Sequence, residues 1–273
     1  MNRLFISIWK RVFTKITMPD IYPPLLVAIF VSASAGLLGA FAILKKMALV
    51  GDALTHVALP GMALGLLFNF SPFLGALAFL VFAIFGIWLM ERYSKLSTET
   101  LVGIFFSASL ALGVLITPDH ELVEALFGNI ISLTWAEAII SAVMALILIL
   151  IILILRRQLA LNMVSSELAQ SAGINNSRLN LIYLLIFALA VALGIRFVGA
   201  VLMGSLVIIP AAAARNIASS FNMFLGLSML AGVLSAVISI FVWQNNGAAP
   251  GPIFILVSVG VFLVTLVIRG LKR

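Results

Sequence analysis

The chain has 273 residues, of which 64% are hydrophobic and 9% charged, and its 16 Lys and Arg outnumber its 9 Asp and Glu. Because a soluble domain carries about 25% charged residues, this composition excludes an ordinary soluble protein and indicates an integral membrane protein. The absence of cysteine excludes disulfides and thiolate metal sites. The basic residues are scattered at helix ends and form no patch, which argues against nucleic-acid binding.

Residues 1–20 form the first distinct segment. They place four basic residues among apolar ones and hold no apolar run long enough for a signal peptide. At helical spacing this pattern predicts a basic amphipathic leader that lies on the membrane surface. A leader that only orients the first span is the alternative.

Residues 21–273 form the transmembrane domain. A span needs roughly 20 apolar residues, and the apolar stretches that qualify are 21–44, 52–70, 72–90, 100–117, 135–155, 179–197, 198–214, 222–243 and 252–268. The stretch 179–214 is ambiguous, because it could hold two short helices or one crossing and a broken piece. We therefore predict an all-α polytopic protein with 8–9 transmembrane helices.

Basic residues fall at alternate ends of these stretches, which predicts that those ends are cytoplasmic. They are Lys45, Lys46, Arg92, Lys95, Arg156, Arg157, Arg215, Arg269, Lys272 and Arg273. Nine spans would place the N-terminus outside, against its own four basic residues. The span count and the side of the leader stay open at this point.

Residues 158–178 are polar enough to leave the bilayer on the cytoplasmic side. Ser165 or Ser166 could cap a short helix there, and Gly173 could end it. A short surface helix between two spans is typical of a docking element for a cytoplasmic partner. An ordinary solvated connection is the alternative.

Asp52 and His56 carry the strongest functional signal. They are four residues apart within an apolar stretch, so on a helix they share one face. Ionisable residues inside a membrane are costly and mark functional sites, and both side chains are ligands for divalent transition metals. The alternative is that Asp52 caps the helix and His56 is a buried histidine bonded to a neighbouring helix.

Pro60 and Gly61 follow this pair directly. Proline has no N–H, so we expect a kink and a freed carbonyl at His56. Gly61 is small enough to let another helix approach closely. The site would then offer a carboxylate, an imidazole and a backbone oxygen on one strip.

One helix supplies too few ligands for closed coordination. A two-fold dimer would bring two copies of Asp52 and His56 together, and this set of four suits tetrahedral Zn²⁺. Added water or carbonyl ligands would suit Mn²⁺ or Fe²⁺. A second cluster of metal-friendly groups, at 118–124 in an external loop, could attract cations or be a solvated turn.

The segment from Lys45-Lys46 through Gly-Asp-Ala-Leu-Thr-His to Leu-Pro-Gly resembles the signature of the permease subunits of zinc, manganese and iron ATP-binding-cassette importers. Further blocks, in family order, begin at Glu99, at Leu126 and at Arg196. The resemblance covers about 22–268. Thr55 replaces a usually smaller residue, and the stretch before Pro250 lacks an aspartate that relatives often carry.

This resemblance implies a homodimeric channel of a bacterial or archaeal plasma (inner) membrane, and not an enzyme. Asp52 and His56 match positions along the cation path, while Glu167, Ala169 and Gly173 match the coupling segment. The implied partners are a second copy, a cytoplasmic ATPase pair, an extracytoplasmic metal-binding protein and the lipid bilayer, with no nucleic acid. No tightly bound cofactor is implied, since the divalent metal is the cargo.

The sequence therefore predicts the permease of an importer for a divalent metal, with zinc first and manganese or iron next. A proton-coupled secondary transporter, in which Asp52 exchanges a proton for metal, is the main alternative. An intramembrane zinc enzyme would need a third protein ligand, and a permease for iron chelates or cobalamin would need no Asp and His pair.

Overall fold

The structure is a computed structural model that describes residues 21–94, 96–116, 133–200, 202–246 and 249–271. Every regular element in these residues is a helix, as the composition predicts. The leader 1–20 and the loop 118–124 lie outside the described residues, so the predictions made for them stay predictions.

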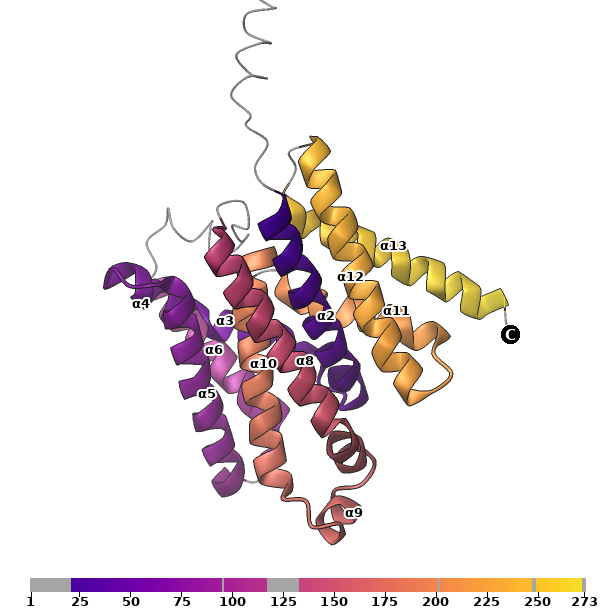
Figure 1. Ribbon diagram of the computed structural model, residues 1–273. Coiled ribbons are helices and arrows are strands. Elements are labelled where there is room, and N and C mark those ends of the chain that lie inside the picture. The colour runs from indigo at the N-terminus through magenta and orange to yellow at the C-terminus, as the bar shows by residue number, and fades with distance from the viewer. Residues whose placement is uncertain (1–20, 95, 117–132, 201, 247–248, 272–273) are drawn as a thin grey trace, which may run out of the picture.

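The helices form one bundle (Figure 1). Their bounds are α2 (Tyr22–Leu44), α3 (Ala48–Val57), α4 (Leu59–Leu67), α5 (Pro72–Ser94), α6 (Thr98–Ile116), α8 (Trp135–Val164), α9 (Ser166–Ser171), α10 (Asn176–Val198), α11 (Met203–Ile217), α12 (Phe221–Asn246) and α13 (Pro250–Leu271).

Eight helical segments within the described residues are long and apolar enough to cross a membrane. They are α2, the pair α3–α4, α5, α6, α8, α10, α12 and α13. The ninth apolar helix, α11, has 15 residues and is about 22 Å long, less than the ~30 Å of a hydrocarbon core. The ambiguous stretch 179–214 therefore consists of one full-length helix and one short one.

Gly199 separates these two helices. It caps the end of α10 with φ 86° and ψ 166°, a backbone conformation that is open essentially to glycine alone. The chain cannot continue as a helix through this conformation. Helix α11 begins four residues later, at Met203.

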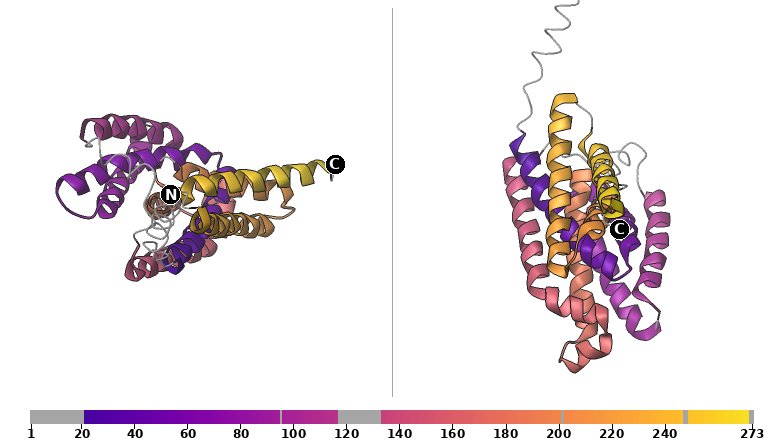
Figure 2. Two further views of the ribbon diagram at one scale, coloured as in Figure 1. Left: turned by 90° about the horizontal axis from the view of Figure 1, so that it is seen from above. Right: turned by 90° about the vertical axis from the view of Figure 1, so that its right-hand side faces the viewer.

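Helix α2 lies at the centre of the bundle and packs against α8, α10, α11 and α12. Its small residues allow this contact: a β-carbon on Gly39 would lie 1.9 Å from the carbonyl oxygen of Val207, and one on Gly36 would lie 2.4 Å from that of Ser228. Close backbone approach at small residues is the usual way in which helices associate in membranes. Helix α13 packs against α11 and α12, and its C-terminal end projects away from the bundle (Figure 2).

The short helix α9 marks one end of the bundle (Figure 1). Lys45, Arg92 and Asn176 line one pocket at this end, whereas α2 begins at the opposite end. Lys45 and Arg92, two of the basic residues that predict cytoplasmic ends, thus lie at the same end of the fold. This end is called the α9 end below.

The segment 158–178 differs in part from its prediction. Helix α8 continues to Val164, so its first seven residues extend the span and only α9 and its flanks form a separate surface element. Thirty residues of α-helix measure about 45 Å, so α8 is longer than the hydrocarbon core. The element predicted to couple to a partner, α9, therefore follows the end of a continuous 30-residue helix.

Candidate metal site on α3

A tight reversal of the chain positions the site helix. Lys46 has φ 59°, and the N–H of Met47 donates to the carbonyl of Ala42 at 2.9 Å. This six-to-one hydrogen bond around a left-handed residue is a Schellman motif, here formed without glycine. Because the turn is so short, α3 begins at Ala48.

Asp52 consequently lies in the second turn of α3. The N-cap of this helix is Met47, which makes no side-chain cap hydrogen bond. The interpretation of Asp52 as a helix cap is therefore wrong. The hydroxyl of Thr55 donates to the backbone carbonyl of Asp52 at 2.6 Å. The polar group of the Thr55 side chain therefore has its hydrogen-bond partner within the same helix.

Gly204, near the start of α11, lies directly against the side chain of Asp52. A β-carbon at position 204 would be 2.7 Å from Asp52 Oδ1 and 2.8 Å from its Cβ, closer than real β-carbons come. Only a glycine lets α11 approach the carboxylate this closely. The sequence does not distinguish Gly204 from the other glycines, because its contact is with a residue 152 positions away in the chain.

His56 lies one turn further along α3. Its ring meets the ring of Phe106 on α6 edge to face, with centroids 5.4 Å apart. Its Nδ1 atom is buried and has no hydrogen-bond partner in the described part of the chain. A hydrogen bond from Nδ1 to a neighbouring helix is thus not seen there, and an imidazole nitrogen is a common ligand for divalent transition metals.

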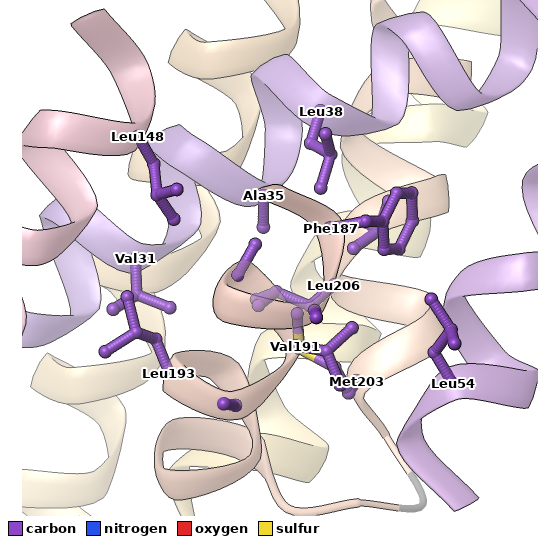
Figure 3. Packing of buried hydrophobic residues seen from close by; sticks show 14 of the residues in the cluster. Val31, Ala35, Leu38, Leu54, Leu148, Phe187, Val191, Leu193, Met203 and Leu206 are labelled. Carbon is purple, nitrogen blue, oxygen red and sulfur yellow. The ribbon is translucent and has the colours of Figure 1, made fainter. Parts of the chain in front are cut away.

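Packing holds these two side chains in place from the other face of α3. Gly51 lies under the ring of Phe187 on α10, where a β-carbon would come within 3.2 Å of the ring. Met203 fills the space beside Gly194 and is fully buried, so it is a packing residue. Figure 3 shows these neighbours of α3 with Leu54 and Leu206.

Pro60 and Gly61 lie directly after the point where the site helix is interrupted. The helix is interrupted at Ala58, and Pro60 stands in the first turn of α4. The N–H of Ala58 donates to the carbonyls of Leu54 and Thr55, at 3.2 Å each, so the expectation of a freed oxygen at His56 stays a prediction. Gly61 meets Gly75 of α5, whose carbonyl oxygen would lie 2.3 Å from an added β-carbon.

The site in one chain therefore consists of one carboxylate and one imidazole nitrogen. The described residues contain no group of three or more His, Cys, Asp or Glu that could hold a metal ion. The arrangement can bind a divalent cation weakly, or strongly when other groups complete the coordination.

The residues expected to couple the permease to an ATPase lie on and beside α9. Ser165 caps this helix by accepting the N–H of Leu168 at 3.2 Å, and Gly173 follows it with φ 79°. Glu167 is exposed, whereas Ala169 is fully buried. The buried alanine anchors α9 to the bundle, so that the acidic side chain faces outward.

One ion pair was not foreseen from the sequence. Arg196 at the end of α10 pairs with Glu137 at the start of α8, and the Glu137 side chain also accepts from the backbone N–H of Thr134 in a capping box. The pair ties two helices at the end of the bundle opposite α9. The Thr-x-x-Glu spacing indicates the capping box. Nothing in the sequence indicates that Arg196 pairs with Glu137.

Comparison with known proteins shows similarity over most of the chain. A model of the ABC 3 transport family matches residues 18–269. The chain is 32% identical to the "High-affinity zinc uptake system membrane protein ZnuB" of Haemophilus influenzae, covering 90% of this chain and 96% of that protein. It is 31% identical to the "Manganese import system permease protein ScaB" of Streptococcus gordonii, covering 91% of each.

A solved structure is similar over its whole length. The chain aligns with "PsaBC from Streptococcus pneumoniae in complex with Fab" at a TM-score of 0.80 and 27% identity, covering 100% of both chains.

Proposed function

We propose that this chain, which belongs to the ABC 3 transport family, is the membrane-spanning permease of an ATP-driven importer for a divalent transition metal. The observation that carries the proposal is the unpaired, buried Nδ1 of His56, one helical turn from Asp52 inside an apolar bundle. A membrane protein has little reason to keep such a pair except to handle a cation.

Zinc is the metal that we propose first. An imidazole nitrogen with a carboxylate oxygen suits Zn²⁺, whereas Mn²⁺ favours more oxygen ligands. The similar proteins carry zinc and manganese in their names, so manganese is the main competitor. The metal passes through as cargo, and the protein needs no tightly bound cofactor.

We propose that two copies complete the site. One chain supplies two ligands, and no third acidic or histidine ligand joins them within the described ranges. A two-fold axis beside α3 would add a second Asp52 and His56, which gives the four ligands of tetrahedral zinc. Each copy alone would bind the ion too weakly to select it.

ATP hydrolysis in a separate pair of cytoplasmic subunits drives the transport in this proposal. These subunits contact α9 and move it, and the continuous helix α8 carries that movement into the bundle. An extracytoplasmic metal-binding protein delivers the ion on the opposite side. The α9 end is then cytoplasmic, in the plasma (inner) membrane of a bacterium or archaeon.

Metal titration of the purified protein in lipid nanodiscs tests the site. Zn²⁺ and Mn²⁺ are titrated into the wild type, Asp52→Asn, His56→Ala and the control His120→Ala, which removes the only other histidine. We expect about one ion per dimer, lost in the first two variants and kept in the control. Equal binding in all four, or loss in the control alone, would refute the assignment.

A proton-coupled secondary transporter predicts a different energy source. Uptake in cells is measured after depletion of ATP and, separately, after addition of an uncoupler. Family membership favours a result in which ATP depletion abolishes uptake and the uncoupler leaves it intact while ATP is maintained. The reverse result would support proton exchange at Asp52.

A further inference from the structure

A polar pocket of about 390 Å³ lies at the α9 end, away from the metal site. The ends of α2, α5, α8 and α10 surround it, and its charged residues are Lys45, Glu91 and Arg92. None of these side chains takes part in the metal site or in the exposed face of α9. The pocket is therefore separate from both of these features.

The one acidic group in the pocket is fully engaged. Asn180 donates to both carboxylate oxygens of Glu91, at 2.9 and 3.2 Å, and Thr98 donates to one of them at 2.5 Å. The same Asn180 accepts from Lys45 Nζ at 2.9 Å. Glu91 thus serves the internal network and is not presented to a ligand.

The two cations retain donors that the network does not use. An ammonium has three N–H donors. Lys45 donates one to Asn180, and its Nζ also lies 4.5 Å from the centroid of the Tyr183 ring. Burial lowers its pKa to about 8, although Glu91 acts in the opposite direction, so the ammonium is still mostly charged at pH 7. A buried cation with free donors gains from a counter-anion.

Arg92 is held at the mouth of the pocket. Its guanidinium stacks over the ring of Trp88 at 3.9 Å and donates through Nε and Nη2 to Ser177 Oγ at 3.3 Å. Since a guanidinium has five N–H donors in a planar fork, several remain to be offered to an anion. The pocket carries a net charge of one positive unit with these three groups ionised.

Asn176 also lines the pocket. Asn176 donates its amide N–H to the carbonyl of Ser166 at 2.8 Å, while its Oδ1 atom is buried and has no partner in the described chain. A buried acceptor without a donor costs free energy. The Oδ1 atom of Asn176 is therefore suited to accept from a hydroxyl or amide donor.

The surface next to the pocket is apolar. Leu89 and Met90 on α5 are 44% and 40% exposed, and Tyr93 is 81% exposed. Tryptophan and tyrosine collect at the level of lipid headgroups. An acyl chain can run along this face of α5 while its headgroup reaches Lys45 and Arg92.

We infer that the pocket binds the headgroup of an anionic phospholipid, with its phosphodiester between Lys45 and Arg92 and a headgroup hydroxyl on Asn176. One phosphodiester carries a single negative charge, which neutralises the pocket. A choline headgroup would add a cation beside two others and would bring no hydroxyl. Basic pockets between helices on the cytoplasmic side are known to take such headgroups.

Native mass spectrometry of the full chain tests this site without metal or ATPase. Palmitoyl-oleoyl phosphatidylglycerol and the matching phosphatidylcholine are titrated into the wild type, Lys45→Gln and Arg92→Gln. The matched controls are Lys46→Gln and Arg157→Gln, which remove equal charges from exposed positions outside the pocket. The conservative Arg92→Lys restores the charge.

We expect a clear preference for phosphatidylglycerol, and a loss of affinity of about fivefold for each cation removed from the pocket. Both controls and Arg92→Lys should stay within about twofold of the wild type. Equal affinity for the two lipids, or equal losses in pocket and control variants, would overturn the site. Because Arg92 is exposed, its variant folds even if Lys45→Gln does not.

An excess of inorganic phosphate or glycerol 3-phosphate distinguishes a lipid from a soluble anion. We expect neither to displace the bound phosphatidylglycerol, since neither carries acyl chains for the α5 surface. Displacement that depends on Lys45 and Arg92 would identify a site for free phosphate and would refute the lipid assignment.

Discussion

The contact between Gly204 and Asp52 gives a sharp test of the metal site. In Gly204→Ala, the new methyl group would lie 2.7 Å from Asp52 Oδ1, about 0.7 Å inside ordinary contact at 3.4 Å. Either the carboxylate rotates away or α11 moves off α3. Overpacking of this kind costs about 1–3 kcal/mol, and displacing a ligand by about 1 Å can cost on the order of a hundredfold in function.

The variant is compared with Gly226→Ala on α12, where an added β-carbon meets nothing within 4 Å. We expect Gly204→Ala to lower the Tm of the detergent-purified protein by about 2–8 °C and to weaken metal binding at least about tenfold. The control should be neutral or slightly stabilised, because alanine favours a helix over glycine. Unchanged Tm and metal affinity in Gly204→Ala would refute the reasoning.

Three further predictions follow from single contacts. Gly61→Val forces a side chain into the α5 backbone 2.3 Å away and should lower Tm by several degrees; a Tm equal to the wild type would contradict the contact. Burial lowers the pKa of Lys45 from 10.5 to about 8, beside Glu91 and Arg92. Between these pH values the unfolded chain binds a proton that the folded chain has lost, so the free energy of unfolding should rise with pH across that window. Denaturation series in the wild type and Lys45→Met check this, and an equal rise in both would exclude Lys45 as its source. Gly173→Val places a β-branched residue at φ 79° at a cost of about 1–3 kcal/mol. It should reduce ATP-driven uptake while leaving metal binding intact, and loss of both together would argue against a separate coupling role.

The fold was predictable wherever composition and local signals agree. Apolar stretches of about 20 residues must form helices in a bilayer, because every backbone group needs a partner there. The predicted helix boundaries were wrong where a turn forms without the glycine that usually occupies it. Helix α3 begins at Ala48 and not at 52 because Lys46 adopts the left-handed conformation, which a lysine gives no reason to expect.

The site was predictable to the same local extent. Four-residue spacing places Asp52 and His56 on one face of any helix, so their pairing needs no tertiary structure. The sequence predicted a kink near Pro60, but not that one helix ends at Val57 and the next begins at Leu59. Local rules describe an uninterrupted helix and do not anticipate how its end rearranges.

The sequence by itself determined the class of protein, the apolar helices and the placement of Asp52 and His56 on one helical face, and it indicated a short helix that Ser165 or Ser166 could cap. These depend on composition and on residues within one or two turns. Tertiary structure alone decided that Gly204 lies against Asp52, that Arg196 meets Glu137, and that Lys45 and Arg92 share a pocket. Each of these contacts joins segments that are distant in the chain. Hydrophobic burial decides which helices pack together, and because it is non-directional, no single residue in the sequence indicates its partner.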